Sequence, residues 1–261
     1  MHRWHLGALL LVVSLVRPAA TNAQVYGPVR QAPEISYGFS LDLASRYVWR
    51  GIKLSDETSL QPSAWISLGD LEIGTWGSHS LDDGYREQDF WATLYLGSTP
   101  AGVLALTVND YYISSDFGSD LFDFEGVRAC EPGEPAYGRP PRCRGGPHTT
   151  EVVASFTSRR TPFDVLVAYN FHNDPEGAVY AQASYRPSVL GFDFAFTGGG
   201  TLNESRLRYQ ADGASLTNLA AGVGRTIVGA PLDIPLAVEI VHNPEIGETY
   251  YVARAGVALQ R

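Results

Sequence analysis

The sequence predicts an all-β protein, a transmembrane antiparallel up-and-down β-barrel of about 12 strands that follows an N-terminal signal peptide. Three observations support this fold class. A short apolar run stands near the N-terminus. Segments in which apolar and polar residues alternate with period two make up most of the remaining chain. The connections between these segments are alternately short and long.

Residues 1–23 have the three regions of a secretory signal peptide. Arg3 lies in a charged start, residues 6–16 form an apolar run, and small residues lead up to Ala23. This run of 11 residues is too short to span a bilayer, which takes roughly 20 residues. We therefore expect export and cleavage after Ala23, then a periplasmic lead-in at residues 24–34 and a barrel at residues 35–261.

The expected mature chain is acidic. The sequence has 19 basic and 28 acidic residues, and loss of Arg3 and Arg17 with the signal peptide leaves 17 − 28, a net charge of −11. Nucleic-acid phosphates repel such a chain, so no nucleic-acid partner is expected. The glycine run at 198–200 lacks the lysine of a phosphate-binding loop, and no cofactor is expected either.

The first strand is expected at residues 35–50. Its odd positions hold Ile, Tyr, Phe, Leu, Leu, Ser, Tyr and Trp, whereas its even positions include Ser, Gly, Asp and Arg. This alternation is typical of a strand with one face in lipid and the other in a polar lumen. The same pattern predicts further strands at residues 59–68, 71–78, 88–97, 102–112, 149–157, 162–171, 178–186, 191–199, 215–226, 233–242 and 249–259.

Loop lengths support the barrel over the alternative, a soluble β-sandwich. Every second connection is short: 69–70, 98–101, 158–161, 187–190 and 227–232. Most of the others are longer: 51–58, 79–87, 113–148, 172–177, 200–214 and 243–248. Outer-membrane barrels have short periplasmic turns and longer external loops, whereas a sandwich has no reason to sort its loops in this way.

Aromatic residues near strand ends suggest two interfacial girdles. The outer girdle is expected to contain Tyr47, Trp49, Tyr111, Tyr112, Phe171, Tyr250 and Tyr251, and the inner girdle Tyr37, Phe163, Tyr185 and Phe192.

Both cysteines lie in the long external loop at 113–148. Cys130 and Cys143 are expected to form a disulfide, because exported proteins mature in an oxidising compartment.

Seven ionisable residues have the parity of the lumen face: Asp42, Arg46, Arg50, Asp89, Glu151, Glu239 and Arg254. An arginine facing lipid at mid-membrane would cost about 2–4 kcal/mol, which favours the inward orientation. Two interpretations remain open. The charges could form a structural network that fills the lumen, or they could line a pore and select its solutes.

An outer-membrane hydrolase is the rival function class. Its catalytic candidates would be His79, His148, His172 and His242, with acidic partners such as Asp82, Asp83 and Asp110, all at the outer rim. No serine stands in a recognisable nucleophile motif, so catalysis is the lesser alternative. A metal site from these histidines is expected even less, since no pair has ligand spacing.

One stretch carries a family resemblance. Residues 45–52 read Ser-Arg-Tyr-Val-Trp-Arg-Gly-Ile, followed by Leu-Ser-Asp at 54–56, Leu-Gln-Pro at 60–62 and Glu-Gln-Asp at 87–89. These motifs resemble the opening of the TorF family, exported bacterial proteins regarded as porins. The likeness covers residues 45–95 and continues as length and rhythm to the end. The insertion at 114–147 and a last residue that is not aromatic depart from it. The resemblance implies an outer-membrane channel without indicating its solute.

We therefore expect a porin that allows small solutes to diffuse through a narrow, charged lumen. Arg46 and Arg50 of the first strand and Arg254 of the last should line its wall, balanced by Asp42 and Asp89. Its partners would be outer-membrane lipid, small solutes and the barrel-insertion machinery. The alternatives are a structural barrel and a rim-binding barrel, both without an open pore.

The signal-peptide prediction is tested at the N-terminus of the mature protein. Sequencing of protein from outer-membrane fractions should give Gln24 as the first residue, because cleavage follows Ala23. Recovery of Met1 from soluble cytoplasm would contradict export.

Overall fold

The structure is a computed structural model that describes residues 35–82, 84–114, 120–137, 140–229 and 231–260. The predicted signal peptide and lead-in lie outside these residues. The regular secondary structure of the described residues is almost entirely β, and its one helix is the one-turn α2 (Arg206–Tyr209). No described helix is long and apolar enough to cross a membrane.

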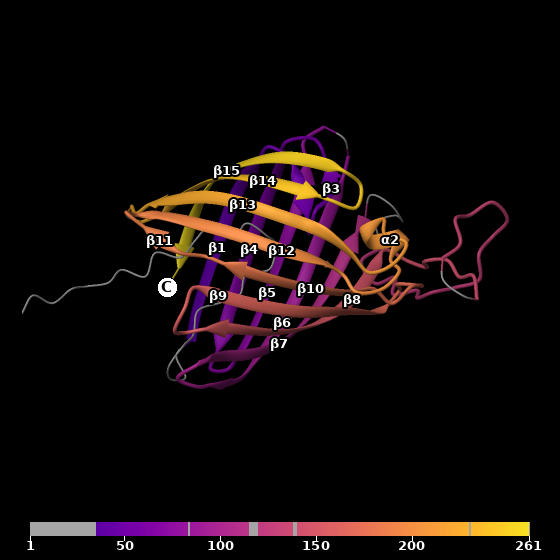
Figure 1. The fold of residues 1–261 in the computed structure, drawn as a ribbon, viewed down its shortest axis with the longest axis horizontal. Helices are drawn as coiled ribbons and strands as arrows, with labels where there is room; N and C mark the ends of the chain where they lie inside the picture. The colour runs from indigo at the N-terminus through magenta and orange to yellow at the C-terminus, as the bar shows by residue number, and fades with distance from the viewer. Residues whose placement is uncertain (1–34, 83, 115–119, 138–139, 230, 261) are drawn as a thin grey trace, which may run out of the picture.

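Twelve antiparallel strands form a closed ring (Figure 1). They are β1 (Ile35–Ala44), β4 (Ser59–Leu68), β5 (Leu71–Ser80), β6 (Arg86–Ser98), β7 (Gly102–Ile113), β8 (His148–Ser158), β9 (Phe163–His172), β10 (Val179–Tyr185), β12 (Phe192–Thr201), β13 (Ser215–Ile227), β14 (Ile234–Asn243) and β15 (Glu248–Gln260). The short β11 (Ser188–Val189) pairs with the start of β12. Two further strands, β2 (Tyr47–Trp49) and β3 (Ile52–Ser55), do not belong to the ring and pair only with each other.

The ring closes where the first strand meets the last. The register of β1 and β15 runs from Gly38 opposite Gln260 to Ala44 opposite Arg254. On its other side β1 pairs with β4 along its whole length. Closure leaves no sheet edge with unpaired backbone groups, which is the condition for a sheet to lie in lipid.

The two faces of the wall differ in chemistry. On β1, Tyr37, Phe39 and Leu41 are exposed to the outside, whereas Ser36 is buried on the lumen side. The other strands repeat this: outward apolar side chains include Leu68, Ile73, Leu94, Leu106, Val108, Val165, Val167, Phe196, Val238 and Ile240. An apolar belt around a closed barrel identifies a membrane-spanning wall.

The predicted strands after the first are confirmed, with ends that differ by at most two residues. The first strand was predicted too long, because β1 ends at Ala44 rather than at Arg50. Beyond it the chain bends at residues 45–46 and enters the β2–β3 hairpin.

The predicted girdles are confirmed in part. The inner aromatics Tyr37, Phe163, Tyr185 and Phe192 are exposed on the outward face, as are Phe171 and Tyr251 near the other end. The remaining outer candidates were predicted wrongly, because Tyr47, Trp49, Tyr111, Tyr112 and Tyr250 are buried. Amphipathic rings pack inside a protein as readily as they lie at a membrane interface, and the sequence pattern is the same.

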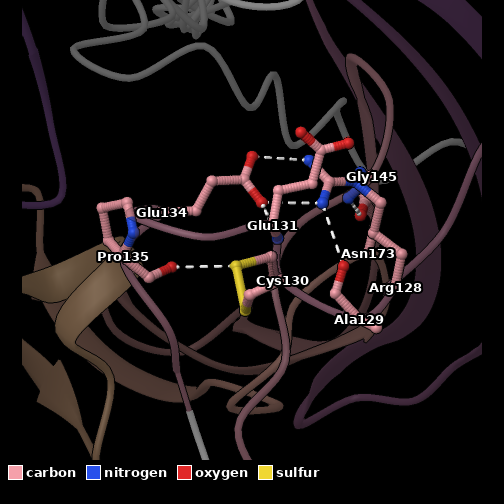
Figure 2. The surroundings of a disulfide bond; sticks show 9 residues. Arg128, Ala129, Cys130, Glu131, Glu134, Pro135, Gly145 and Asn173 are labelled. Carbon is pink, nitrogen blue, oxygen red and sulfur yellow. Dashed lines mark hydrogen bonds and ion pairs between the residues drawn. A yellow bond between two sulfur atoms is a disulfide. The ribbon is translucent and has the colours of Figure 1, made fainter.

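The long loop between β7 and β8 carries the predicted disulfide. Cys130 and Cys143 are bonded, with their Cα atoms 4.9 Å apart (Figure 2). Closing a loop of this size stabilises the fold by about 3 kcal/mol in the chain-entropy picture. The described parts of this loop extend beyond the end of the barrel at which α2 lies (Figure 1).

Polar contacts order the two arms of this loop. Arg128 donates two hydrogen bonds to the carboxylate of Glu134, at 2.8 and 2.7 Å (Figure 2). These bonds, together with one from the backbone N–H of Glu131, lower the pKa of Glu134 to about 2. At the base of the loop, the Asn173 side chain accepts from Gly145 N–H and donates to the carbonyl oxygen of Gly146.

The membrane assignment predicts that the same substitution, to arginine, lowers stability strongly at one exposed apolar residue and hardly at all at another. Val108 lies on the outward face of β7 with 42 % of its surface exposed, and Phe122 lies in the external loop with 82 % exposed. Val108→Arg should destabilise the folded barrel in lipid vesicles by about 2–4 kcal/mol. Phe122→Arg should change the stability by less than about 0.5 kcal/mol, because its side chain is in water.

Equilibrium urea unfolding in vesicles, followed by tryptophan fluorescence and heat-modifiable migration, measures both variants. Equal stability of the two would contradict the placement of β7 in the membrane.

Candidate functional site

The β2–β3 hairpin lies inside the barrel. All residues from Tyr47 to Ile52 are buried, although they connect two strands of the wall. At the tip, Arg50 and Gly51 have φ values of 48° and 85°. Two consecutive residues with positive φ are typical of the type I′ turn, whose twist fits a two-residue hairpin.

The turn sequence indicates why the hairpin sits where it does. Only glycine fits at position 51, because a Cβ there would overlap the carbonyl oxygen of Thr217 on β13. Asn243 of β14 also donates a hydrogen bond of 3.1 Å to the carbonyl oxygen of Gly51. Arg50 is an unusual choice for a left-handed position, which costs a side chain with a Cβ about 1 kcal/mol or more. Its guanidinium contacts must offset this strain.

Arg50 forms a two-pronged ion pair with Glu151 of β8. Its two terminal nitrogens lie 2.6 and 3.0 Å from the two carboxylate oxygens, and one also donates to the hydroxyl of Tyr209 at 2.8 Å. Tyr111 and Asn109 of β7 donate to the same carboxylate, at 2.8 and 3.3 Å. Only 3 % and 1 % of the Arg50 and Glu151 side chains are exposed. Fork-like, charge-assisted hydrogen bonds of this kind fix both partners in orientation.

Aromatic rings surround the guanidinium. Its carbon lies 4.6 Å from the ring centre of Trp49 and 4.5 Å from that of Tyr180 on β10. Tyr209 of α2 stacks on both rings, with centroids 5.5 Å from Trp49 and 5.1 Å from Tyr180. A second connection between wall strands, the one that carries α2, therefore also reaches into the lumen. Ring faces attract a cation, and most strongly where water is excluded.

The Arg50 side chain crosses the bore from the hairpin tip. The hairpin starts beside β15, where Ser45 N–H donates to the Ala253 carbonyl oxygen at 2.9 Å. The backbone of its tip stays on this side of the ring, against β13 and β14. The Arg50 guanidinium reaches Glu151 of β8, which is the sixth strand from β15 in either direction around the ring and so lies opposite it. Tyr47 of the hairpin contacts Trp76 of β5, with ring centroids 5.2 Å apart. At this level the hairpin and the Arg50 side chain together narrow the lumen.

The wall below the hairpin carries small hydroxyl side chains and a second set of charges. Inward hydroxyl residues include Ser36, Ser63, Ser67, Thr93, Thr107, Ser155, Ser184 and Thr197. Arg254 lies 3.6 Å from Glu239, and Arg186, which follows β10, pairs with Asp164 of β9. This part of the lumen is polar, in contrast to the aromatic region around the hairpin.

The structure brings together some of the predicted lumen residues. Arg50 meets Glu151, and Arg254 meets Glu239. Asp42 faces inward on β1, close to the backbone of Gly256. Asp89 is buried on β6 and is not the partner of an arginine ladder, since its carboxyl interacts with that of Glu87.

The prediction that Arg46 and Arg50 form a ladder on one wall strand was wrong. The chain leaves the wall after Ala44, so neither arginine belongs to β1. Arg46 pairs with Asp56 of the same connection at 3.3 Å, with 31 % of its side chain exposed. Arg50 reaches the lumen from the hairpin tip instead.

Sequence reasoning missed Tyr111, Tyr180 and Tyr209 as part of the site. The Arg-Gly pair at 50–51, flanked by apolar residues, was the available signal for a turn. Nothing in the sequence indicates that Tyr209, in a different loop, stacks on Trp49.

Two of the candidate rim histidines have side-chain partners in the structure, and one of them, His242, bonds the hydroxyl of Thr249 at 2.9 Å. His148 bonds Asp110 at 2.7 Å, and its other ring nitrogen bonds the carbonyl oxygen of Leu121 at 2.9 Å. Both ring nitrogens are therefore engaged without a nucleophile. In the part of the chain that the structure describes, no group of three or more His, Cys, Asp or Glu residues could hold a metal ion.

Comparisons of the sequence with known families and curated proteins do not identify a family for this chain. No family model matches the chain, and no curated protein is similar to it. The resemblance to the TorF family therefore stays a prediction.

Several solved structures of membrane barrels align with the chain at low identity. A structure named "KdgM porin" is 7 % identical, with 86 % of this chain and 98 % of that chain covered and a TM-score of 0.47. The COG4313 outer membrane channel from Pseudomonas putida F1 is 13 % identical, with 94 % and 100 % covered and a TM-score of 0.45. The high-pH structure of Pseudomonas putida OprB is 9 % identical, with 78 % and 59 % covered and a TM-score of 0.32.

The buried ion pair predicts a large difference between two cations of the same hairpin. Arg50→Ala leaves Glu151 without its guanidinium partner in a dry site, so it should lower the free energy of unfolding by about 3–5 kcal/mol. Lys53→Ala removes an exposed pair with Asp56 and should cost at most about 1 kcal/mol. Urea unfolding in detergent micelles measures both variants, and similar losses would show that the Arg50 pair does not hold the hairpin.

Proposed function

We propose that this protein is an outer-membrane channel through which small solutes diffuse passively, with the β2–β3 hairpin at its narrowest point. The observation that carries the proposal is a connection with a charged tip that folds into a bore whose other lining includes many hydroxyl groups and further charged pairs. A barrel with a purely structural role could fill its lumen with side chains of the wall. Folding a loop inward instead leaves a closure that can move independently of the sheet.

The lining supports a path for polar solutes. Serine and threonine hydroxyls can exchange hydrogen bonds with water or with a solute, because each is both donor and acceptor. The pairs Arg254–Glu239 and Arg186–Asp164 stand on separate parts of the ring. Charges of both signs around a lumen produce a transverse field, which orients solutes that carry a dipole.

A structural barrel without a pore is the second candidate. The near-complete burial of Arg50, Glu151 and Tyr209 favours it, since water does not reach these groups. Twelve strands give a lumen between the filled eight-stranded barrels and the open sixteen-stranded porins. Strand number therefore leaves both candidates possible, and the state of the hairpin decides between them.

Conductance measurements on the refolded protein in planar bilayers test the proposal. Replacing residues 46–56 with a short Gly-Ser linker should raise the single-channel conductance several-fold over the native barrel. The matched control replaces a segment of equal length, residues 132–142, in the disulfide loop, whose described residues extend beyond the end of the barrel. That variant should conduct like the native protein.

Two outcomes would contradict the proposal. If the variant without the hairpin shows no conductance, although heat-modifiable migration shows it folded, the structural role is favoured. If it conducts no better than the native protein and the loop control, the hairpin is not the constriction.

A further inference from the structure

We infer that the wall around Glu151 is a binding site for solutes that carry a guanidinium group, and that Arg50 occupies this site as a tethered stand-in for the solute. This inference rests on the proposed channel function and names its solute class. The evidence is the arrangement of wall groups around the Arg50 side chain.

The wall groups suit a planar cation. The two oxygens of Glu151 face two guanidinium nitrogens, a geometry that an ammonium group cannot reproduce. Tyr111 and Asn109 donate to the same carboxylate and fix its plane. The ring of Tyr180 lies 4.5 Å from the guanidinium carbon. Carboxylate, orienting donors and an aromatic face together form a recognition site for guanidinium.

These groups belong to the barrel wall and not to the hairpin. Tyr111 and Asn109 lie on β7, Glu151 on β8 and Tyr180 on β10. The wall therefore keeps its site when the hairpin leaves, whereas Trp49 leaves together with Arg50. Tyr209 belongs to α2, and its hydroxyl oxygen can still accept a hydrogen bond from a guanidinium while its ring stacks on Tyr180.

The residue at the hairpin tip fits the site better than it fits the turn. Type I′ turns favour Asn or Gly at the first central position, which is the position of Arg50. The other cation of the hairpin, Lys53, faces water and pairs with Asp56. The tip therefore places a guanidinium on the wall at the expense of turn geometry.

Exchange of Arg50 for a solute conserves charge. Glu151 would stay paired with a cation before and after the exchange, so the step avoids an unpaired buried carboxylate. Glu87 and Asp89 add further acidic groups on β6. A guanidinium solute that competes for Glu151 would release the Arg50 side chain from β8 and clear the part of the bore that this side chain spans, whereas a neutral or anionic solute has no such exchange available.

Chemical rescue tests the site without requiring conductance. Arg50→Ala removes the atoms of ethylguanidinium from the side chain and leaves the wall intact. Ethylguanidinium, added up to about 20 mM and far below the molar range in which guanidinium denatures, should raise the midpoint of thermal unfolding of this variant in detergent. If the variant folds poorly, the readout is its refolded fraction by heat-modifiable migration.

Three controls make the rescue specific. Ethylammonium should bind Arg50→Ala with at least about tenfold lower affinity than ethylguanidinium, because an ammonium group cannot donate to both oxygens of Glu151 in the bidentate geometry. The unfolding midpoint of the native protein should rise far less, because exchange of Arg50 for ethylguanidinium replaces one ion pair with another and adds none. The double variant Arg50→Ala with Glu151→Gln should lose the response. Absence of rescue in Arg50→Ala, or equal rescue by ethylammonium, would overturn the inference.

Transport by the native protein supplies a second readout. In liposome swelling, arginine should enter several-fold faster than citrulline, which has nearly the same shape but a neutral end group. Equal rates would overturn the solute class. If neither solute enters while ethylguanidinium still rescues Arg50→Ala, the channel function fails and the guanidinium site stands.

Discussion

Closure of the sheet is the constraint on which the other features depend. In lipid, each backbone N–H and C=O group must find its partner within the protein, and the β1–β15 pairing completes a ring in which this is achieved. The ring has twelve strands and its inward residues include many serines and threonines, so the wall alone does not pack its own interior. Segments between the strands supply the missing volume: the β2–β3 hairpin, and α2 with Tyr209.

The position of the Arg50 side chain in the lumen depends on its buried ion pair with Glu151. A pair taken out of water gains little net stability, because desolvation of both charges offsets their attraction, whereas loss of one partner is expensive. Arg50 and Glu151 therefore hold the hairpin at one place on the wall rather than adding much to the stability of the barrel. A packed apolar plug would resist any polar competitor, but a charged contact can be exchanged for another charge of the same sign.

The period-two pattern predicted the wall well and the site poorly, for one physical reason. A lipid-facing strand and a strand packed inside a lumen both alternate, and a sequence does not indicate which apolar environment covers the aromatic side chains. β2 continues the alternation of β1 through Tyr47 and Trp49, so the predicted strand ran past the bend at residues 45–46. The parity of Glu151, Glu239 and Arg254 was correct because their strands stay in the wall. The partners of Arg50 come from β7, β8, β10 and α2, and such long-range contacts leave no local pattern.

The two groups of charges in the lumen differ in how they are held. Arg254 and Glu239 belong to neighbouring strands of the rigid sheet, so their separation of 3.6 Å is set by the register of β14 and β15. Arg50 and Glu151 are 101 residues apart in the chain and meet only because the hairpin folds into the bore. The first pair is therefore a fixed part of the lining, present whenever the barrel is folded. The second can break while every backbone hydrogen bond of the wall remains, which is the independence that the proposed constriction requires.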